Sequence, residues 1–239
     1  MLKLLARLNF SLTELSSLVN LPNAQYQTRL IHLQELINSN QKNQFIQELN
    51  DYQSEHANDN NIQYRLNQIM FKSIGAHELN LPEPSTAEIK FLVTYFWQCE
   101  YWSHYDLTIF GNTAYLLDPE LRVQLLKEII KLIEMQVLHG INTRDPIRIV
   151  INTIFDFFHS ENYRRADILI QIIAPIIPNN YVFEKGYLLA AKVILVNHDR
   201  NRFSYEVPEP EELLKLIKLI DSQGLSKIIN QEFKDQGIG

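Results

Sequence analysis

Cysteine, long apolar runs and basic residues are all scarce in this chain of 239 residues, and each scarcity excludes a class of protein. The single cysteine, Cys99, allows no internal disulfide framework and is typical of a protein of the reducing cytoplasm. No apolar run approaches the roughly 20 residues that a transmembrane helix needs. The 22 lysine and arginine residues are outnumbered by 28 acidic residues, so the net charge of −6 argues against a large nucleic-acid-binding surface.

Signatures of catalysis and of metal binding are also missing. The sequence holds no phosphate-binding loop, no serine nucleophile elbow and no His-Glu-x-x-His or Cys-x-x-Cys motif. The seven histidines are spread singly, mostly near expected helix ends, where an imidazole can bind a terminal carbonyl group or water. We therefore expect neither an enzyme nor a site for a metal or cofactor.

What the sequence does contain predicts an all-α fold. All nine prolines lie in connectors or at expected helix starts. In Asp118-Pro119 and Asp145-Pro146 we expect the aspartate to cap a helix and the proline to take its first position. Ser85-Thr-Ala-Glu88 is typical of a capping box. Between these signals apolar residues recur with the helical period, as in residues 26–37, and no two-residue alternation indicates a strand.

These signals place helices near residues 1–8, 12–20, 24–39, 41–56, 60–80, 85–100, 102–116, 119–139, 146–160, 162–174, 180–198, 209–222 and 225–236. From residue 24 onward the helices form pairs that recur at roughly 35–45 residues, the spacing of TPR and HEAT-like arrays. We therefore expect residues 21–239 to form a TPR-like right-handed superhelix of antiparallel helix pairs. In such an array the first helix of each pair lines a concave surface.

Three asparagines lie within otherwise apolar helical runs: Asn67, Asn112 and Asn152. Asparagine is unfavourable inside a helix because its side chain competes for backbone hydrogen bonds. In one interpretation the three carboxamides line the concave surface and bind the backbone of an extended peptide, since each has a donor and an acceptor. In the other they brace neighbouring helices or face water. Each asparagine lies on the first helix of a different pair, which favours the surface.

Tyrosines on the same helices would add amphipathic walls to this surface. Arg144 and Arg148 lie one turn apart before Asn152 and could receive a carboxylate. The candidate peptide-binding residues are Tyr105, Asn112, Tyr115, Arg144, Arg148, Asn152, Phe155, Tyr187 and Asn67.

A family resemblance supports this interpretation. The segment WSHYDLTIFGN, from Trp102 to Asn112, resembles the W-x-x-Y-[DE]-x-x-[LI]-[LF]-x-N signature of the Rgg/GadR/MutR family of Gram-positive transcription regulators. Residues 213–235 are similar to the last two helices of that family. The resemblance implies a repeat domain that binds a short hydrophobic signalling peptide in quorum sensing, forms a homodimer and controls an N-terminal helix-turn-helix. It also implies that Asn112 and Asn152 face the peptide, while Tyr115 stands where some receptors carry arginine.

Residues 1–20 resemble only the end of that family's DNA-binding domain and the linker that follows it. We expect the chain to be a fragment of a longer regulator, the alternative being a short form that does not read DNA. Contact with DNA would then depend on a helix-turn-helix that this chain does not include.

A non-catalytic helical-repeat scaffold for a protein partner is the alternative function. A peptide sensor should have a deep, apolar groove with a few amides and one cationic anchor, whereas a scaffold should have a broad and charged one.

Two C-terminal segments are candidates for the interface of the expected homodimer. Residues 168–177, with the sequence ILIQIIAPII, are more apolar than one face of a surface helix requires. Residues 213–220 carry Lys215 and Lys218 on one side of a helix and aliphatic residues on the other. Both segments fit the core of the last repeats equally well.

Overall fold

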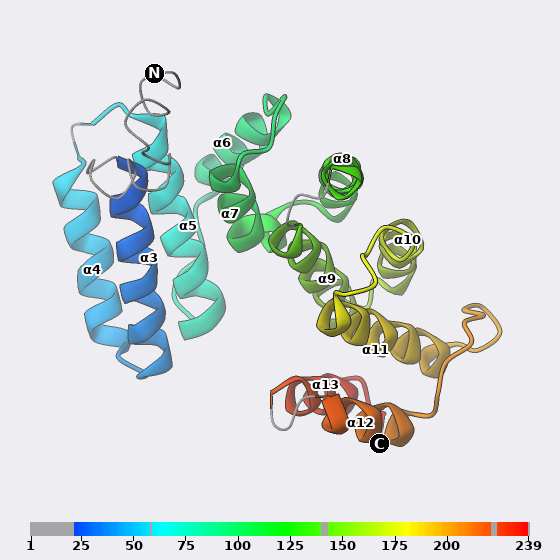
Figure 1. The fold of residues 1–239 in the computed structure, drawn as a ribbon. Coiled ribbons are helices and arrows are strands. Elements are labelled where there is room, and N and C mark those ends of the chain that lie inside the picture. The colour runs from blue at the N-terminus through cyan, green and yellow to red at the C-terminus, as the bar shows by residue number, and fades with distance from the viewer. Residues whose placement is uncertain (1–21, 58, 140–142, 221–223, 239) are drawn as a thin grey trace, which may run out of the picture. The chain divides into compact units, whose positions relative to one another are not determined.

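A computed structural model describes residues 22–57, 59–139, 143–220 and 224–238 of the chain. Within these ranges it contains eleven α-helices and one short 3-10 helix, and no strand (Figure 1). The predicted all-α fold is therefore confirmed. No helix in the described ranges is long and apolar enough to cross a membrane. The helices expected at 1–8 and 12–20, and the domain remnant assigned to residues 1–20, lie outside the described residues.

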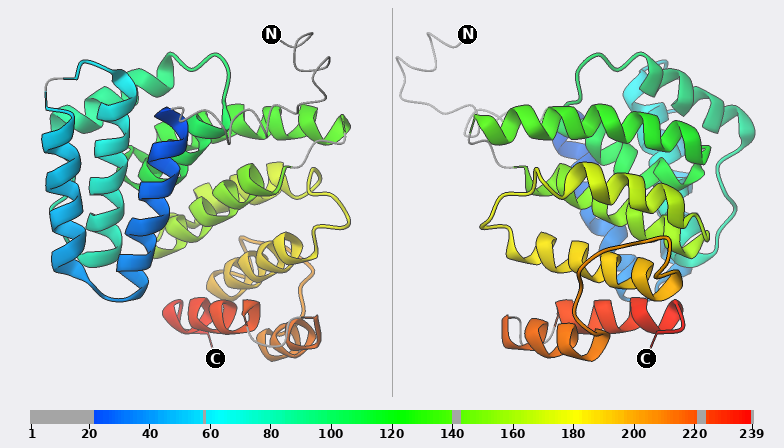
Figure 2. Two further views of the ribbon diagram at one scale, coloured as in Figure 1. Left: turned by 60° about the vertical axis from the view of Figure 1, so that its left-hand side comes forward. Right: turned by 90° about the vertical axis from the view of Figure 1, so that its right-hand side faces the viewer.

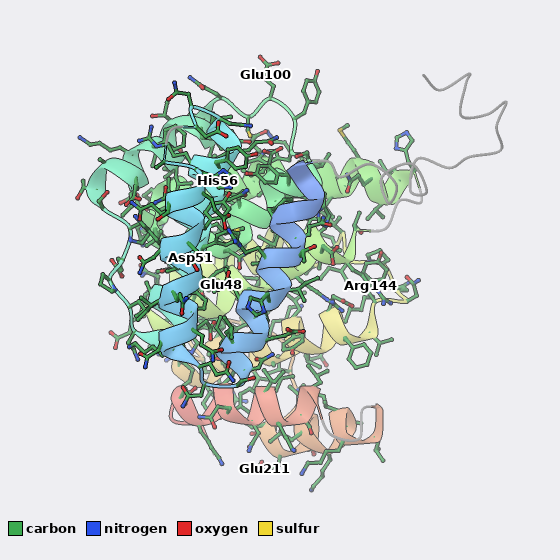
Figure 3. All side chains as sticks on the ribbon, turned by 90° about the vertical axis from the view of Figure 1, so that its left-hand side faces the viewer. Glu48, Asp51, His56, Glu100, Arg144 and Glu211 are labelled. Atoms are coloured by element: carbon green, nitrogen blue, oxygen red, sulfur yellow. The ribbon has the colours of Figure 1, made fainter. Side chains whose placement is uncertain are left out.

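Close contacts divide the chain into two compact units, one ending at Tyr95 and one beginning at Phe96. The N-terminal unit contains α3 (Pro22–Asn38), α4 (Lys42–Glu55), α5 (Ile62–Leu79) and most of α6 (Thr86–Trp97). Helices α3, α4 and α5 pack against one another around a core that includes Phe45, Leu66 and Phe71. Figure 3 shows Glu48 and Asp51 along α4. The assignment of residues 21–239 to one continuous array stays a prediction.

The C-terminal unit arranges its first helices in two layers. Its elements are α7 (His104–Thr113), the 3-10 helix η1 (Ala114–Leu116), α8 (Pro119–Leu138), α9 (Arg144–His159), α10 (Tyr163–Ile173), α11 (Val182–His198), α12 (Pro210–Ile220) and α13 (Leu225–Asp235). Helix α9 contacts α7 and α11 in one layer, and α8 contacts α10 in the other. Helix α9 also packs on α8 and α10, which joins the layers, and Figure 2 shows the successive helices stacked toward α12 and α13. This two-layer stacking is the arrangement that helical repeats use.

Two of the three predicted helix starts are confirmed. The Asp118 side chain accepts hydrogen bonds from the Glu120 and Leu121 amides, with Pro119 at the first helical position. Ser85 and Glu88 exchange the hydrogen bonds of a capping box.

The start expected at Asp145-Pro146 is wrong, because α9 begins at Arg144 and its N-cap is Thr143. Pro146 is thus the third residue of the helix, where it is tolerated because the first amides of a helix have no partner within it. A proline near a helix start indicates where the first turn lies. It does not identify the first helical residue, which depends on the conformation of the residues just before the helix.

The two segments expected at a dimer interface differ in burial. In residues 168–177 most of the large apolar side chains are core residues, including Leu169, Ile170 and Ile173. On α12 the apolar side chains divide: Leu213 is buried, whereas Leu219 is 84% exposed. Homodimer formation stays a prediction.

Candidate functional site

Helix α9 presents a polar stripe on one side and an apolar face on the other. Its Pro146, Val150, Ile154 and Phe157 are buried, which directs that side of the helix toward the core. From Ile149 onward the exposed or half-exposed positions recur every three to four residues. All such positions of the helix are Arg144, Asp145, Arg148, Ile149, Asn152, Asp156 and His159. That spacing places them along one side of the helix. The polar stripe is therefore the surface that α9 turns away from its core contacts.

Both neighbours in the first layer border this stripe. On one side Gly111 of α7 lies so close to Ile149 that a Cβ atom at position 111 would be 3.1 Å from Ile149 Cγ1. On the other side the ring centroids of Phe155 and Tyr187 of α11 are 6.1 Å apart. The surface formed by Gly111, Asn112, the α9 stripe and Tyr187 is called the α7–α9–α11 face below.

Asn152 is the most accessible of the three asparagines. Its side chain is exposed, and it makes no hydrogen bond to any residue in the described part of the chain. Asn112 is half-buried, and its Nδ2 donates a hydrogen bond of 2.8 Å to the Thr108 carbonyl oxygen, one turn earlier in the same helix. The exposed Asn152 amide therefore does not brace α9 against another described helix, and the Asn112 hydrogen bond lies within its own helix.

Asn67 has a different environment. It belongs to α5 of the N-terminal unit, is 4% exposed, and donates from Nδ2 to the Tyr52 hydroxyl at 3.1 Å. The Tyr52 ring lies edge-on to Phe71, so the amide completes a buried aromatic cluster. Asn67 has the geometry of an internal brace.

Arg148 is joined to α11 by an ion pair. Its Nε donates to Glu184 Oε1 at 3.0 Å, and its side chain is 55% exposed whereas that of Glu184 is 1% exposed. Arg144, labelled in Figure 3, lies at the start of α9 with its guanidinium carbon 4.9 Å from the centre of the Tyr181 ring. The Tyr181 hydroxyl accepts a hydrogen bond of 3.2 Å from the Thr143 amide. The two arginines are thus both engaged with α11 or the residue that caps it.

The four candidate aromatic residues differ in how much of their surface is exposed and in what they contact. Phe155 is 7% exposed and belongs mainly to the core. Tyr187 is half-buried. Tyr105 is half-buried on α7, and Tyr115 is half-buried in η1, where its carbonyl oxygen accepts from Arg122 Nη2 at 2.8 Å.

Sequence reasoning missed Glu184, Gly111 and Phe183. Glu184 resembled an ordinary acidic residue in the first turn of a helix, and nothing in the sequence pairs it with Arg148. Phe183 is 41% exposed and precedes Tyr187 by four residues, so the two aromatic side chains lie on one side of α11. An aromatic residue at a helix start followed by another one turn later is the only signal that the sequence offers.

The N-terminal unit contains a pocket of about 320 Å³ between α4, α5 and the connector that follows α5. Its lining is mixed, and the residues are Ile46, Leu49, Asn50, Tyr52, Gln53, Gln68, Lys72, Leu81, Pro82 and Glu83. The Lys72 ammonium group is already paired with Glu88 at 2.7 Å. None of the predicted binding residues lines this pocket.

Three solved structures have a similar fold. The SHP pheromone receptor Rgg2 of Streptococcus dysgalactiae matches with a TM-score of 0.70 and 16% identity over 98% of this chain and 83% of that one. A cysteine-to-serine variant of that receptor gives 0.71 and 17% over 98% and 82%. A proposed transcriptional regulator of Listeria monocytogenes EGD-e gives 0.65 and 14% over 98% and 83%. At these identities the likeness establishes the fold.

The sequence itself establishes the family. The profile of the C-terminal domain of the HTH-type transcriptional regulator Rgg matches residues 46–230, which span both compact units and include the predicted signature. The resemblance inferred from residues 102–112 is thereby confirmed. The chain belongs to the Rgg family of helix-turn-helix-type transcriptional regulators and carries its C-terminal domain.

Proposed function

We propose that this domain is the effector part of a transcription regulator and that its α7–α9–α11 face binds a short hydrophobic signalling peptide. The relative named as an SHP pheromone receptor supports a peptide ligand. Binding would be relayed to a helix-turn-helix domain. The observation that carries the proposal is Asn152, an exposed amide on a strongly amphipathic helix, without a hydrogen-bond partner among the described residues.

The chemistry of the face suits an extended peptide. A helical layer offers no strand edge to a bound peptide, so side-chain amides must satisfy the N–H and C=O groups of its backbone. Asn152 can donate and accept at once. Ile149 and the half-buried Tyr187, whose ring centroid is 6.1 Å from that of Phe155, offer apolar surface within the same face. We therefore assign the peptide-backbone contacts to Asn152 and Asn112, and the apolar contacts to the side chains around them.

A scaffold for a protein partner is the competing function. The side chains of the face favour a peptide sensor, because the exposed Asn152 amide lies one turn after the partly apolar surface that Ile149 contributes.

A thermal-shift screen of the whole chain against short hydrophobic peptides tests the proposal. A ligand that binds only the folded state stabilises it by mass action, by about 2.7 kcal/mol at a hundredfold excess over Kd. We expect a saturable rise in melting temperature with individual aliphatic peptides. If no such peptide raises the melting temperature and a folded protein partner does, the scaffold function is correct instead.

A further inference from the structure

The pocket of the N-terminal unit has the size and the mixed lining of a small-molecule site. Its volume of about 320 Å³ falls within the range of ligand pockets, roughly 300–1,000 Å³. Its lining residues belong to α4, to α5 and to residues 81–83, so the pocket lies wholly within this unit. The α7–α9–α11 face belongs to the other unit, and the two sites share no residue.

Helix α4 turns one side toward the pocket. Its four lining residues besides Tyr52 recur at the spacing i, i+3, i+4 and i+7, which places them on one side of the helix. They are Ile46, Leu49, Asn50 and Gln53. Two of these side chains are aliphatic and two are carboxamides. Helix α5 adds Gln68 and Lys72, which lie one turn apart. The pocket therefore combines an apolar surface with amide groups from both helices.

The connector after α5 gives the pocket a fixed wall. The Leu81 amide donates to the Gly75 carbonyl oxygen at 3.2 Å, and the Lys42 ammonium group donates to the Leu79 carbonyl oxygen at 2.7 Å. The capping box at the start of α6 holds the other end of the connector. A ligand would therefore find this wall already ordered, which lowers the entropy cost of binding.

The charges of the lining favour a neutral ligand. Lys72 is the one cation among the described lining residues, and its ammonium group is paired with Glu88 at 2.7 Å. The lining carboxylate of Glu83 is exposed and so remains hydrated. A ligand carboxylate would have to compete with Glu88 for Lys72 and would be repelled by Glu83. A ligand ammonium group would lose its own hydration for a weak, screened pair with Glu83.

Three carboxamides of the lining are available to a ligand. The side chains of Asn50, Gln53 and Gln68 make no hydrogen bond to a described residue. Each offers both a donor and an acceptor. The Tyr52 hydroxyl, by contrast, already accepts a hydrogen bond from Asn67 at 3.1 Å. The polar groups left over in the pocket are therefore neutral amides, whose natural partners are amide and hydroxyl groups.

We propose that this pocket binds a small neutral molecule that has an aliphatic body and an amide or hydroxyl head group. The aliphatic body packs on Ile46, Leu49 and Leu81, and the head group exchanges hydrogen bonds with Gln53 and Gln68. This second ligand site goes beyond the proposed peptide binding and does not depend on it.

Methyl NMR of the whole chain, with labelled isoleucine δ1 methyl groups, tests the inference. Ile46 reports on the pocket, and Ile149 reports on the α7–α9–α11 face. The probes are heptanamide, heptan-1-ol, heptanoate and heptylammonium, which share an aliphatic chain and differ in the head group. The proteins compared are the wild type, Gln68→Met, Gln53→Met and the control Gln47→Met. Gln47 is an exposed residue of α4 that does not line the pocket.

We expect heptanamide and heptan-1-ol to shift the Ile46 signal saturably in the wild type and in Gln47→Met, and to leave the Ile149 signal in place. Heptanoate and heptylammonium should bind roughly tenfold more weakly or worse, because a charged head group loses hydration without gaining a free partner. Gln68→Met and Gln53→Met should each weaken heptanamide binding roughly twofold to tenfold, the range for one neutral hydrogen bond.

The contrary results each overturn the inference in a different way. If no probe shifts the Ile46 signal of the wild type, the pocket is not a small-molecule site, while the proposed peptide binding is unaffected. If a charged probe binds as tightly as heptanamide, the neutral ligand class is wrong. If Gln68→Met and Gln53→Met are folded by circular dichroism and bind heptanamide as tightly as Gln47→Met, the amides do not form the site. A shift of Ile149 in place of Ile46 would assign the probes to the α7–α9–α11 face and refute the second site.

Discussion

At the scale of single residues, three asparagines with the same sequence context have three different environments. Asn67 is buried against Tyr52, Asn112 binds a carbonyl group of its own helix, and Asn152 is exposed. Their shared pattern, a polar residue within an apolar run, correctly marked unusual positions. It could not separate a brace from a surface amide, because that difference depends on the neighbouring helix and not on the local sequence.

Asn67 should matter for stability and not for peptide affinity. Burial raises the pKa of the Tyr52 hydroxyl to about 12, against the opposing effect of the hydrogen bond from Asn67. In Asn67→Ala the buried hydroxyl loses that partner, so we expect the free energy of unfolding to fall by about 1–3 kcal/mol. Urea denaturation measures the loss. An Asn67→Ala variant as stable as the wild type would contradict the internal role.

The Glu88 carboxyl group should make the stability of the folded protein depend on pH. Burial alone would raise the pKa of this carboxyl group, but hydrogen bonds from Lys72 and Ser85 outweigh burial and hold the pKa below its ordinary value. A carboxyl group with a lowered pKa in the folded state stabilises the protein above its unfolded pKa, of about 4.3, and loses this contribution as the pH falls through the folded value.

We therefore expect the melting temperature of the wild type to fall more steeply between about pH 5 and 3 than that of Glu88→Gln, which has no charge to lose at this position. Circular dichroism melts across that range measure the difference. Glu211→Gln, which changes an exposed acidic residue of α12 (Figure 3), is the control and should follow the wild type. Parallel curves for wild type and Glu88→Gln would show that the Lys72 ion pair contributes nothing.

At the scale of helices, the sequence predicted most of the architecture. Proline placement and apolar periodicity placed the described helices within a few residues of their bounds, because these features act within one helix. The start of α9 was misplaced because Thr143 offered no recognisable cap: its side chain makes no capping hydrogen bond. The Arg148–Glu184 pair joins positions 36 residues apart, so no local pattern could reveal it.

Two helix glycines should respond oppositely to alanine. A Cβ atom at Gly75 would lie 2.6 Å from Phe45 Cε1 and 2.9 Å from Leu81 Cδ1, and the Phe45 ring is fully buried. At Gly111 the contact is 3.1 Å with Ile149 Cγ1, and that side chain is only partly buried and can move. Alanine favours a helix over glycine by about 1 kcal/mol, whereas overpacking a core costs about 1–3 kcal/mol.

We expect Gly75→Ala to lower the free energy of unfolding and Gly111→Ala to leave it unchanged or slightly higher. Urea denaturation of the two variants checks both expectations against the wild type. Equal stability of Gly75→Ala and Gly111→Ala would show that the close packing at Gly75 relaxes without cost.

At the scale of the whole molecule, the exposed apolar side chains of the last two helices bear on assembly. Leu216 and Leu219 of α12 are 51% and 84% exposed, and Ile228 of α13 is 48% exposed. We expect light scattering to give about twice the chain mass of 28.1 kDa, and Leu219→Lys to shift the protein toward the single-chain mass. A wild type that stays at the single-chain mass at micromolar concentration would contradict a homodimer through these helices.

The central claim is that the α7–α9–α11 face binds a peptide through its amides. Fluorescence polarisation tests this claim most directly, with a labelled form of a peptide that raises the melting temperature in the thermal-shift screen. Unpaired backbone groups in a desolvated site cost about 1–3 kcal/mol each, so Asn152→Ala should weaken binding roughly tenfold to a hundredfold without lowering the melting temperature. Asn112→Ala should do the same. Gln124→Ala, which removes an exposed amide from α8 in the other layer, should match the wild type. Equal affinity of the wild type and Asn152→Ala would contradict the account.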